Sequence, residues 1–538
     1  MKTDYFKSKT AIFCIFMFVI VSFVFFKCKS PNIIKQEIIV SNVNHSIPFN
    51  GFISGAPYYE IVNILGHTNV IKINGAYCKG DVITFPLTAY KDRLITIEFT
   101  ADVRREGATG GLYWGLNNHN YPSLVYLENA ATGIWHKMKG RMIITPTDNN
   151  PYFFLSAYQN NSQNTVYYIS NLSINIIEGD TRTPDFSLKL LKEIYSEYFL
   201  IGNTTGIYGE NMYGKSLDLI KHHFNIITCN VFYPQLLAPI NKGEAFQFTN
   251  ADKIINILRR ENFEIYGHLL VWHSLTPAWM FEGSRDEVLQ NMNNHIITVM
   301  RHYRGRVNSW EVVAEAIKTT VNATEVRGDW RNNVRKSEPG IPNLWYEKLG
   351  ADYIEIAFRT ARATDPNAIL YYSDYIIHND INKAEVIRKM IFDINERYKI
   401  ETSGTRNLIE GVGLQSHFGE FNVDLRIERS NLEKFASLGI DVFISELDIA
   451  STRYRVGSGL NSVMSEREQI IQGRLYAQLL QLYKEYSDYI TRVTFFGLDD
   501  QTSWRSDGNP TLFDSNLNAK QAFYAVSDPE GFLRRNRI

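Results

Sequence analysis

The chain divides into two parts that differ in their pattern of apolar and polar residues. Between residues 45 and 178, apolar residues recur at every second position, as in the segment LITIEFTADV. This segment places five apolar residues on one face, at the period of a half-buried strand: Ile95, Ile97, Phe99, Ala101 and Val103. Polar clusters such as TDNN and NNSQN separate similar segments and indicate turns. The pattern predicts an all-β jelly-roll sandwich over residues 40–180.

From residue 188 to residue 530, short apolar runs alternate with segments of helical period. The segment FTNADKIINILRREN, for example, predicts a helix with Thr249 as its N-cap and Asp252 three positions later. Eight runs have the composition of strands: residues 199–206, 225–232, 265–272, 307–315, 369–375, 410–417, 441–449 and 490–500. Eight strands that alternate with helices predict an α/β fold, a (β/α)8 TIM barrel that follows the sandwich.

The N-terminal segment has the pattern of an export signal. Lys2, Lys7 and Lys9 precede the uncharged run TAIFCIFMFVIVSFVFF at residues 10–26. Positive residues before an apolar stretch are typical of secretory signals. Residues 1–30 are therefore predicted to be a signal peptide or a membrane or lipid anchor. Lipidation of Cys28, an uncleaved anchor and full release remain open, and each predicts a secreted or cell-surface protein.

Composition and charge narrow the classes of partner. The net charge of the 538-residue chain is −1, so it carries no overall positive charge for binding nucleic acid. Four cysteines without a CxxC pair predict neither a disulfide framework nor a metal site. Aromatic residues make up 13% of the chain, which suits both a large core and stacking on sugar rings. We expect a monomer that binds a polysaccharide.

Polar residues follow most of the apolar runs, and the carboxyl ends of barrel strands are where the active site of this fold lies. The polar and aromatic residues at the ends of these runs are Trp272 and His273; Glu315; Asp374 and Tyr375; Gln415 and His417; Glu446 and Asp448; and Asp499, Asp500 and Trp504. Paired carboxylates such as Glu315 and Glu446 are typical of glycoside hydrolysis. One protonates the leaving oxygen, while the other attacks the anomeric carbon or activates water. His417 and Asp448 are placed to keep Glu446 ionised by hydrogen bonding.

Four stretches closely resemble glycoside hydrolase family 10: YGHLLVWHSLTPAWM (266–280), GVGLQSHF (411–418), DVFISELDI (441–449) and TFFGLDDQTSW (494–504). Members of this family are mostly retaining endo-β-1,4-xylanases on a (β/α)8 barrel, and the resemblance covers about residues 190–530. It implies Glu446 as the nucleophile and Glu315 as the acid/base. The residues expected to contact substrate are His273, Trp272, Gln415, His417, Asp448, Trp504, Phe496 and Asn230.

The resemblance also sets expectations for the chemistry of the site. It implies no cofactor and no metal, and His268 is expected to be a hydrogen-bonded core residue. The pKa of Glu315 is expected to be raised, whereas that of Glu446 is expected to be ordinary or lowered.

Two stretches of the N-terminal part, GIWHKMKGRMIIT and YYISNLSINI, resemble carbohydrate-binding modules of the jelly-roll type. In those modules the tryptophan that precedes the lysine-rich strand is mostly structural, so Trp135 is expected to pack in the core. Tyr113 and Trp114 are the candidates for stacking on sugars, with core packing as the alternative.

The chain departs from the family pattern around the reacting sugar. Family members usually have an asparagine before the acid/base, and its amide contacts the 2-hydroxyl of that sugar. Here the residue is Ala314. The family's strand-two motif, T-A-E-N-x-M-K, aligns with TCNVFYP, so that Asn230, Val231 and Pro234 stand where Glu, Asn and Lys are usual.

Two further strands depart as well. Phe496 replaces a usual tryptophan, and Ser373 and Ile376 replace two amides. These changes predict a wider and more apolar pocket lined by Val231, Phe232 and Phe496.

Three functions are compatible with the sequence. The first is a retaining endo-β-1,4-xylanase-type hydrolase that acts on xylan or a related cell-wall β-glycan. The second is a retaining glycosidase with altered specificity for a decorated or non-xylan glycan, which the lost contacts favour. The third is a non-catalytic glycan-binding protein, against which the retained carboxylate pair argues.

Overall fold

The computed structural model describes residues 59–537, except residues 65, 75–80, 108–111, 118–122, 128–131, 147–150, 158–164, 338–341 and 452–463. The predicted leader at residues 1–30, including Cys28, lies outside the described part. None of the described helices is long and apolar enough to cross a membrane.

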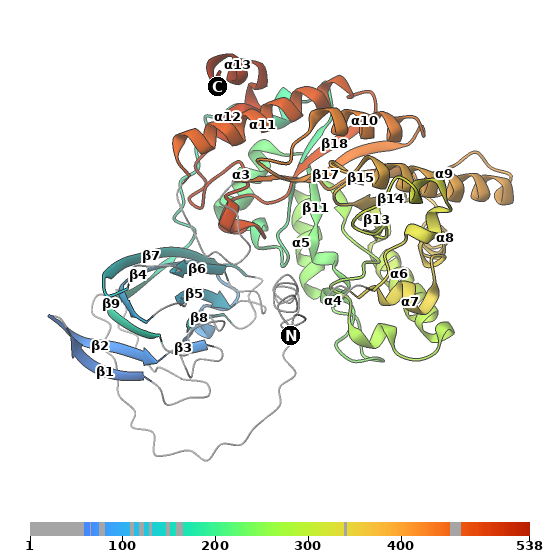
Figure 1. The fold of residues 1–538 in the computed structure, drawn as a ribbon. Coiled ribbons are helices and arrows are strands. Elements are labelled where there is room, and N and C mark those ends of the chain that lie inside the picture. Colours follow the sequence, from blue (N-terminus) through green and yellow to red (C-terminus); the bar gives the residue numbers. More distant parts are fainter. Residues whose placement is uncertain are drawn as a thin grey trace, which may run out of the picture.

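The N-terminal part forms two antiparallel sheets (Figure 1). One sheet has the strand order β1 (Tyr59–Ile64), β2 (His67–Asn74), β9 (Val166–Glu178), β4 (Ile95–Glu106) and β7 (Trp135–Ile144). The other has the order β3 (Asp81–Pro86), β8 (Tyr152–Ala157), β5 (Leu112–Asn117) and β6 (Ser123–Leu127). The five alternating apolar residues predicted for one face all lie in β4 and are at most 1% exposed. The period of two therefore identified a buried strand face, because successive side chains of a strand point to opposite sides.

Trp135, at the start of β7, stacks on His67 with ring centroids 4.2 Å apart. Its side chain is only half-buried, so Trp135 packs on a neighbouring ring but does not lie in the fully buried core that was expected. Tyr113 and Trp114 lie in β5, but their side chains are outside the described part, so their role as stacking residues stays a prediction.

The C-terminal part is an eight-stranded parallel barrel surrounded by helices (Figure 1). Its strands are β10 (Leu200–Thr204), β11 (Ile226–Cys229), β12 (Glu264–Gly267), β13 (Ser309–Ala314), β14 (Ile369–Asp374), β15 (Gly411–Leu414), β17 (Asp441–Ala450) and β18 (Ile490–Phe495). Each lies within or overlaps one of the eight predicted runs. Pairing of β10 with β18 and of β15 with β17 closes the barrel. The fold prediction, a TIM barrel preceded by an antiparallel β domain, is confirmed.

Helices pack around this barrel and bury its outer surface. They are α2 (Leu191–Ile194), α3 (Gly214–His223), α4 (Pro234–Leu237), α5 (Thr249–Arg260), α6 (Arg285–Tyr303), α7 (Leu344–Leu349), α8 (Tyr353–Thr364), α9 (Ile381–Thr402), α10 (Leu425–Ala436), α11 (Glu466–Glu485), α12 (Gln521–Ser527) and α13 (Pro529–Arg535). The N-cap predicted at Thr249 is wrong by one position. Thr249 is already helical, and Phe248 caps α5 without a side-chain hydrogen bond. Asp252 instead forms ion pairs with His302 and Arg306.

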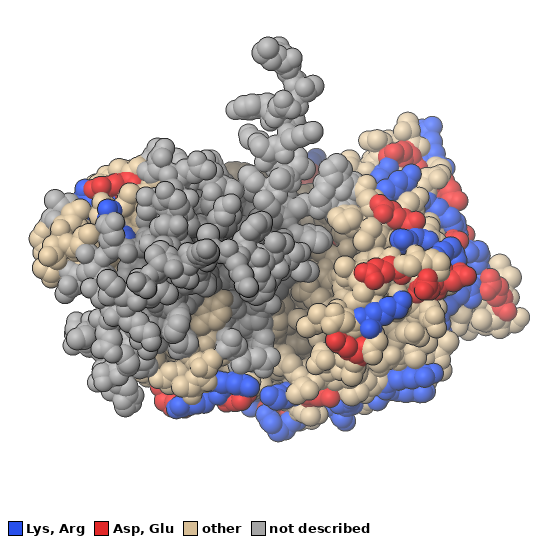
Figure 2. Space-filling model, turned by 90° about the horizontal axis from the view of Figure 1, so that it is seen from below, with Lys and Arg blue, Asp and Glu red and all other residues tan. Residues whose placement is uncertain are grey.

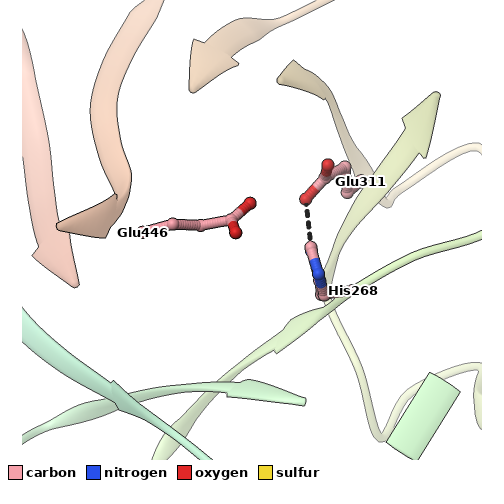
Figure 3. Close-up of side chains that lie close together, drawn as sticks. All are labelled: His268, Glu311 and Glu446. Atoms are coloured by element: carbon pink, nitrogen blue, oxygen red, sulfur yellow. Dashed lines mark hydrogen bonds and ion pairs between the residues drawn. The ribbon is translucent and has the colours of Figure 1, made fainter. Parts of the chain in front are cut away.

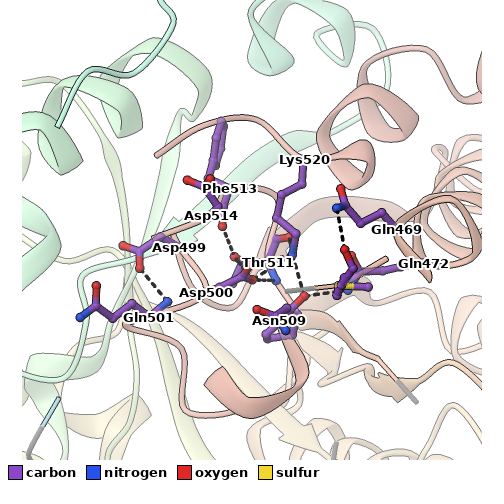
Figure 4. A network of polar contacts seen from close by, with 12 residues as sticks. Gln469, Gln472, Asp499, Asp500, Gln501, Asn509, Thr511, Phe513, Asp514 and Lys520 are labelled. Atoms are coloured by element: carbon purple, nitrogen blue, oxygen red, sulfur yellow. Dashed lines mark hydrogen bonds and ion pairs between the residues drawn. The ribbon is translucent and has the colours of Figure 1, made fainter. Parts of the chain in front are cut away.

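The two parts contact each other beside the segment that follows β18. Gln501 donates a hydrogen bond to the carbonyl of Arg141 in β7 (2.7 Å), and Arg141 donates one to Asn516 (2.9 Å). On the same segment, a buried network joins Asp500, Thr511 and Lys520 (Figure 4). The β domain is therefore attached to the barrel at the loop that carries Trp504.

The described surface carries charges of both signs. On the face shown in Figure 2, Lys and Arg residues are interspersed with Asp and Glu residues over the barrel. This mixture agrees with the net charge of −1.

Candidate active site

Glu315 directly follows β13 and has an unusual backbone conformation. Its φ is +56°, in the left-handed region that non-glycine residues rarely adopt. The surrounding structure holds it there, because its N–H donates to the carbonyl of Ser373 (2.9 Å) and its own carbonyl accepts from Arg335 (3.2 Å). Such strained positions cluster at functional sites, where neighbouring contacts fix them. The turn places the carboxylate at the barrel mouth, with 15% of the side chain exposed.

Two side chains approach the Glu315 carboxylate, one from the end of β15 and one from the segment after β12. The amide of Gln415 donates to Oε1 (3.0 Å), and Nε2 of His273 lies 4.0 Å from Oε2. Burial, helped by the charge of Arg335, lowers the pKa of His273 to about 3, so its imidazole is neutral. Both groups are suited to orient the carboxyl group of Glu315 without adding a charge.

Glu446 lies in β17 and is 5% exposed. Nε2 of His417 is 3.2 Å from its Oε2, and Nδ1 of the same ring forms a 3.0 Å ion pair with Asp448. Trp504 donates its indole N–H to Asp448 (3.0 Å), and Arg505 forms an ion pair with the other oxygen. The Oε1 atom of Glu446 is buried and has no hydrogen-bond partner among the described residues.

The strand geometry explains how His417 reaches Asp448. The chain leaves β15, turns at Ser416 with a φ of +59°, and re-enters the sheet as β16 (His417–Gly419). In the parallel register of β16 and β17, His417 is the partner of Asp448. The two residues predicted to support Glu446 are therefore brought together.

The charges of this group are strongly coupled. Burial lowers the pKa of His417, but the charge of Asp448 and contact with Glu446 outweigh it and raise that pKa to about 9. Burial raises the pKa of Glu446, against the hydrogen bond from His417. The expectation of an ordinary or lowered pKa for Glu446 is therefore wrong, because the sequence did not show how completely β17 is enclosed. The hydrogen bond from His417 and the charge of His268 limit the rise in the pKa of Glu446.

Beneath Glu446 lies a second buried pair, His268 and Glu311. Nδ1 of His268 donates to Glu311 (2.7 Å), as does the hydroxyl of Tyr266 (2.8 Å), while Ser373 donates to the other carboxylate oxygen. Figure 3 shows the Glu446 carboxylate facing this pair from the opposite strand. Burial lowers the pKa of His268, but the charge of Glu311 prevails and raises it.

His268, Glu311 and Glu446 bring their ligand atoms within 4.8 Å of one another, a spacing that a metal ion could bridge. However, both His268 nitrogens and both Glu311 oxygens already have hydrogen-bond partners in the protein. A cation would have to displace these bonds. The expected role of His268 as a hydrogen-bonded core residue is confirmed.

The region after β11 differs from the predicted pocket. The strand ends at Cys229, and a 3-10 helix, Asn230–Phe232, follows. This helix turns Val231 and Phe232 into the main core, where Phe232 packs on Tyr303 and Trp310. The prediction that Val231 and Phe232 line a wide apolar pocket is therefore wrong.

Asn230 is 3% exposed, and its amide donates to the hydroxyl of Tyr233 (3.1 Å). Asn230 therefore reaches the site through Tyr233, a residue that the sequence did not single out. Its contact with substrate stays a prediction.

Three predicted aromatic residues surround the carboxylates. Trp272 stacks on Tyr233, with centroids 5.8 Å apart. Phe496 makes edge contacts with His417 and His268 at 5.5 and 6.1 Å. Trp504 packs its edge on His417 at 4.9 Å and remains 58% exposed. Trp504 is thus an aromatic surface beside Glu446 that is open to a ligand.

Other residues at the strand ends have structural partners instead. Asp374 is fully buried in an ion pair with Lys383 (2.7 Å). Asp500 pairs with Lys520 (2.9 Å), and Asp499 lies 3.6 Å from Arg182. Because these carboxylates are neutralised by buried cations, they anchor the loops around the site.

Sequence reasoning missed three groups in the site: Glu311, Tyr266 and Tyr233. A charged residue inside the apolar run VNSWEVVAE was a usable signal for Glu311, since an ionised group is buried in a strand only with a partner. Tyr266 and Tyr233 gave no such signal, because tyrosine is common in cores.

Comparison with known proteins agrees with this geometry. The profile of glycosyl hydrolase family 10 matches residues 190–529. Endo-1,4-beta-xylanase A of Thermoanaerobacterium saccharolyticum is 32% identical over 430 residues, which cover 76% of this chain and 34% of the relative. The Beta-1,4-xylanase of Dictyoglomus thermophilum is 32% identical over 345 residues, which cover 62% of this chain and 90% of the relative. The chain spans about a third of the length of the first curated relatives that it matches.

Solved structures show the same similarity. A GH10 xylanase from termite gut that contains a bacterial Ig-like domain is 31% identical, with a TM-score of 0.58, over 71% of this chain and 85% of that one. A glutamate-to-alanine mutant of the intracellular xylanase from Thermoanaerobacterium saccharolyticum, in complex with xylotetraose, is 30% identical. Its TM-score is 0.55, over 64% of this chain and all of that one. The matched family profile over residues 190–529, together with the barrel and its paired glutamates, shows that the chain belongs to glycosyl hydrolase family 10.

Proposed function

We propose that this protein is a retaining glycoside hydrolase of the endo-β-1,4-xylanase type, with Glu446 as nucleophile and Glu315 as acid/base. The observation that carries the proposal is the asymmetric environment of Glu446. Its Oε2 is held by His417, while its buried Oε1 has no partner among the described residues. A carboxylate with one oxygen fixed and the other free is arranged for attack on carbon.

Two displacement steps follow from this arrangement. In the first, Oε1 of Glu446 attacks the anomeric carbon, the glycosidic C–O bond breaks, and the Glu315 carboxyl group gives its proton to the leaving oxygen. In the second, Glu315 removes a proton from water, and that water's oxygen attacks the same carbon and releases Glu446. The anomeric configuration is therefore retained.

The neighbouring residues have separable roles in these steps. The charged His417 stabilises the Glu446 carboxylate before attack and after release, and Asp448 holds the His417 ring in place. Gln415 and His273 orient Glu315. The exposed face of Trp504 offers a stacking surface for a sugar ring bound beside Glu446.

The substrate class is inferred from the relatives. Several similar proteins at about 30% identity are named endo-1,4-beta-xylanases, and a similar solved structure, of an intracellular xylanase mutant, holds xylotetraose. A second candidate, hydrolysis of a decorated or different β-glycan, is favoured by one observation. Ala314 and the segment from Asn230 to Pro234 lack the side chains that family members direct at the sugar.

The test is product release from linear xylan, arabinoxylan, glucuronoxylan, mixed-linkage glucan and cellulose. Wild type would be assayed beside Glu446→Ala and Glu315→Ala. The proposal predicts activity on linear xylan that Glu446→Ala abolishes and Glu315→Ala reduces by about 10²- to 10⁴-fold. Activity confined to arabinoxylan, glucuronoxylan or a glucan would support the second candidate, and no activity on any of the five would contradict both.

A further inference from the structure

Tyr233 occupies the part of the site that the usual asparagine before the acid/base would reach. It follows the 3-10 helix after β11, is 6% exposed, and packs with Ala314 and Leu269 in one buried cluster. Its ring also stacks on Trp272. Because Ala314 and Tyr233 are both almost fully buried, a longer side chain at position 314 would enter the space that the phenol ring fills.

The hydroxyl of Tyr233 is held by two neighbours. The Asn230 amide donates to it (3.1 Å), and Nε2 of His268 lies 3.2 Å away. The Glu311 carboxylate accepts from Nδ1 of the same imidazole. A phenol hydroxyl can both donate and accept, so one further hydrogen bond remains open to Tyr233, whichever of its hydroxyl and Nε2 of His268 donates to the other.

The hydroxyl of Tyr233 lies near the carboxylates of the site. Burial raises its pKa, and the charges of Glu446, Glu311 and Glu315 raise it further, so the phenol stays protonated. Both Glu311 oxygens already accept hydrogen bonds. Oε1 of Glu446 has no hydrogen-bond partner among the described residues, so it does not take up the bond left open at Tyr233.

We propose that Tyr233 is a specificity-determining residue that forms a hydrogen bond with the 2-hydroxyl of the sugar bonded to Glu446. It supplies from the end of β11 the contact that Ala314 cannot supply from β13. The small side chain of Ala314 leaves room for the Tyr233 ring. His268 and Asn230 orient the Tyr233 hydroxyl, and Glu311 holds His268 in place. This inference rests on the proposed hydrolase function.

The first experiment removes only the hydroxyl. Tyr233→Phe and wild type would be compared on an aryl β-xylobioside and on the same compound without the 2-hydroxyl at the cleaved sugar. We expect kcat/KM to fall about 10- to 100-fold on the parent compound, since hydrogen bonds to this hydroxyl strengthen in the transition state. On the 2-deoxy compound, the two proteins should differ by less than about threefold, because the partner hydroxyl is absent.

The matched control is Tyr195→Phe. Tyr195 is 1% exposed and donates its hydroxyl to the carbonyl of Val526, away from the site. Tyr195→Phe should leave kcat/KM unchanged on both compounds. This control shows whether a loss in Tyr233→Phe comes from the Tyr233 contact or from the removal of any buried hydroxyl.

A double variant tests whether an asparagine at position 314 can replace the contact made by Tyr233. Tyr233→Ala combined with Ala314→Asn should have a higher kcat/KM than Tyr233→Ala alone, because the amide then has room and supplies the missing bond.

Equal losses on the parent and 2-deoxy compounds, or an unchanged Tyr233→Phe variant in an active enzyme, would overturn the inference alone. Wild type that cleaves no aryl β-glycoside and no polysaccharide of the panel would overturn the proposed function, and the inference with it.

Discussion

The Nε2 atom of His417 lies 3.2 Å from Oε2 of Glu446. The far side of the same imidazole is paired with Asp448, which raises the pKa of His417 to about 9 despite its burial. A buried cation is thus kept beside the proposed nucleophile throughout the neutral range. This relationship explains how a carboxylate in an enclosed strand, whose pKa burial raises, can still be used in its charged form.

The stability of the protein should depend on the proton of His417. Its folded-state pKa is raised from 6.5 to about 9, so the folded protein binds this proton more tightly than the unfolded chain does. The stabilisation is complete below pH 6.5 and is lost as the pH rises to about 9. In urea unfolding at pH 6, 8 and 9.5, the gap between wild type and His417→Gln should shrink with rising pH. A gap that stays constant would show that the charge of His417 is not involved.

The charge of His417 should also set the upper pH limit of activity. The pH profile of kcat/KM should fall with an apparent pKa near 9 as His417 loses its proton. In Asp448→Asn this limit should move to lower pH, because the carboxylate that raises the pKa of His417 is gone. A limit at the same pH in both proteins would assign it to another group.

The role of Glu315 as proton donor predicts an effect that depends on the leaving group. Glu315→Ala should reduce kcat/KM on xylan by about 10²- to 10⁴-fold, the usual contribution of a general acid. On a 2,4-dinitrophenyl β-glycoside, whose leaving group needs no proton, kcat/KM should change little. Added azide should raise turnover and give a β-glycosyl azide, detected by NMR. An equal loss on both substrates would contradict the assignment.

The exposed ring of Trp504 should contribute to substrate binding more than to stability. Trp504→Ala should raise KM by about 3- to 10-fold, equivalent to about 0.5–1.5 kcal/mol for a lost aromatic contact. Trp504→Phe keeps a ring but loses the 3.0 Å hydrogen bond to Asp448, so it serves as the control for that bond. If both variants bind xylo-oligosaccharides as wild type does in calorimetry, Trp504 is not a stacking surface.

The buried pair of Asp500 and Lys520 should matter for stability. The Lys520 ammonium donates to the Asp500 carboxylate (2.9 Å) and to the carbonyls of Asn509 and Thr511 (Figure 4). Lys520→Met leaves the carboxylate buried without a cation and should cost about 3–5 kcal/mol in the free energy of unfolding. Lys215→Met breaks an exposed pair with Asp218 and should cost less than about 1 kcal/mol. Similar losses in the two variants would contradict this account.

Much of the barrel was predictable because its strands leave a direct signal. Parallel strands buried on both faces read as short apolar runs, and their polar ends converge on one rim. Glu315, Glu446, Gln415 and His417 were found in this way, and the structure brings them into two contacting pairs.

The rest of the site depends on geometry that no local pattern encodes. After β11 the chain continues as a short 3-10 helix, so that Phe232 packs in the main core while Tyr233 contacts His268. The enclosure that raises the pKa of Glu446 likewise comes from packing between distant strands. Alternation along the sequence could not show either feature.

The most direct test of the central claim is covalent trapping of the nucleophile. The protein would be incubated with a 2-deoxy-2-fluoro-β-xylobioside that carries a good leaving group, digested, and analysed by mass spectrometry. Retaining catalysis through Glu446 predicts one added fluoroglycosyl group, located on the peptide that contains Glu446, and its absence in Glu446→Gln. A label on another residue, or hydrolysis of the parent aryl xylobioside by wild type with inversion of configuration, would contradict it.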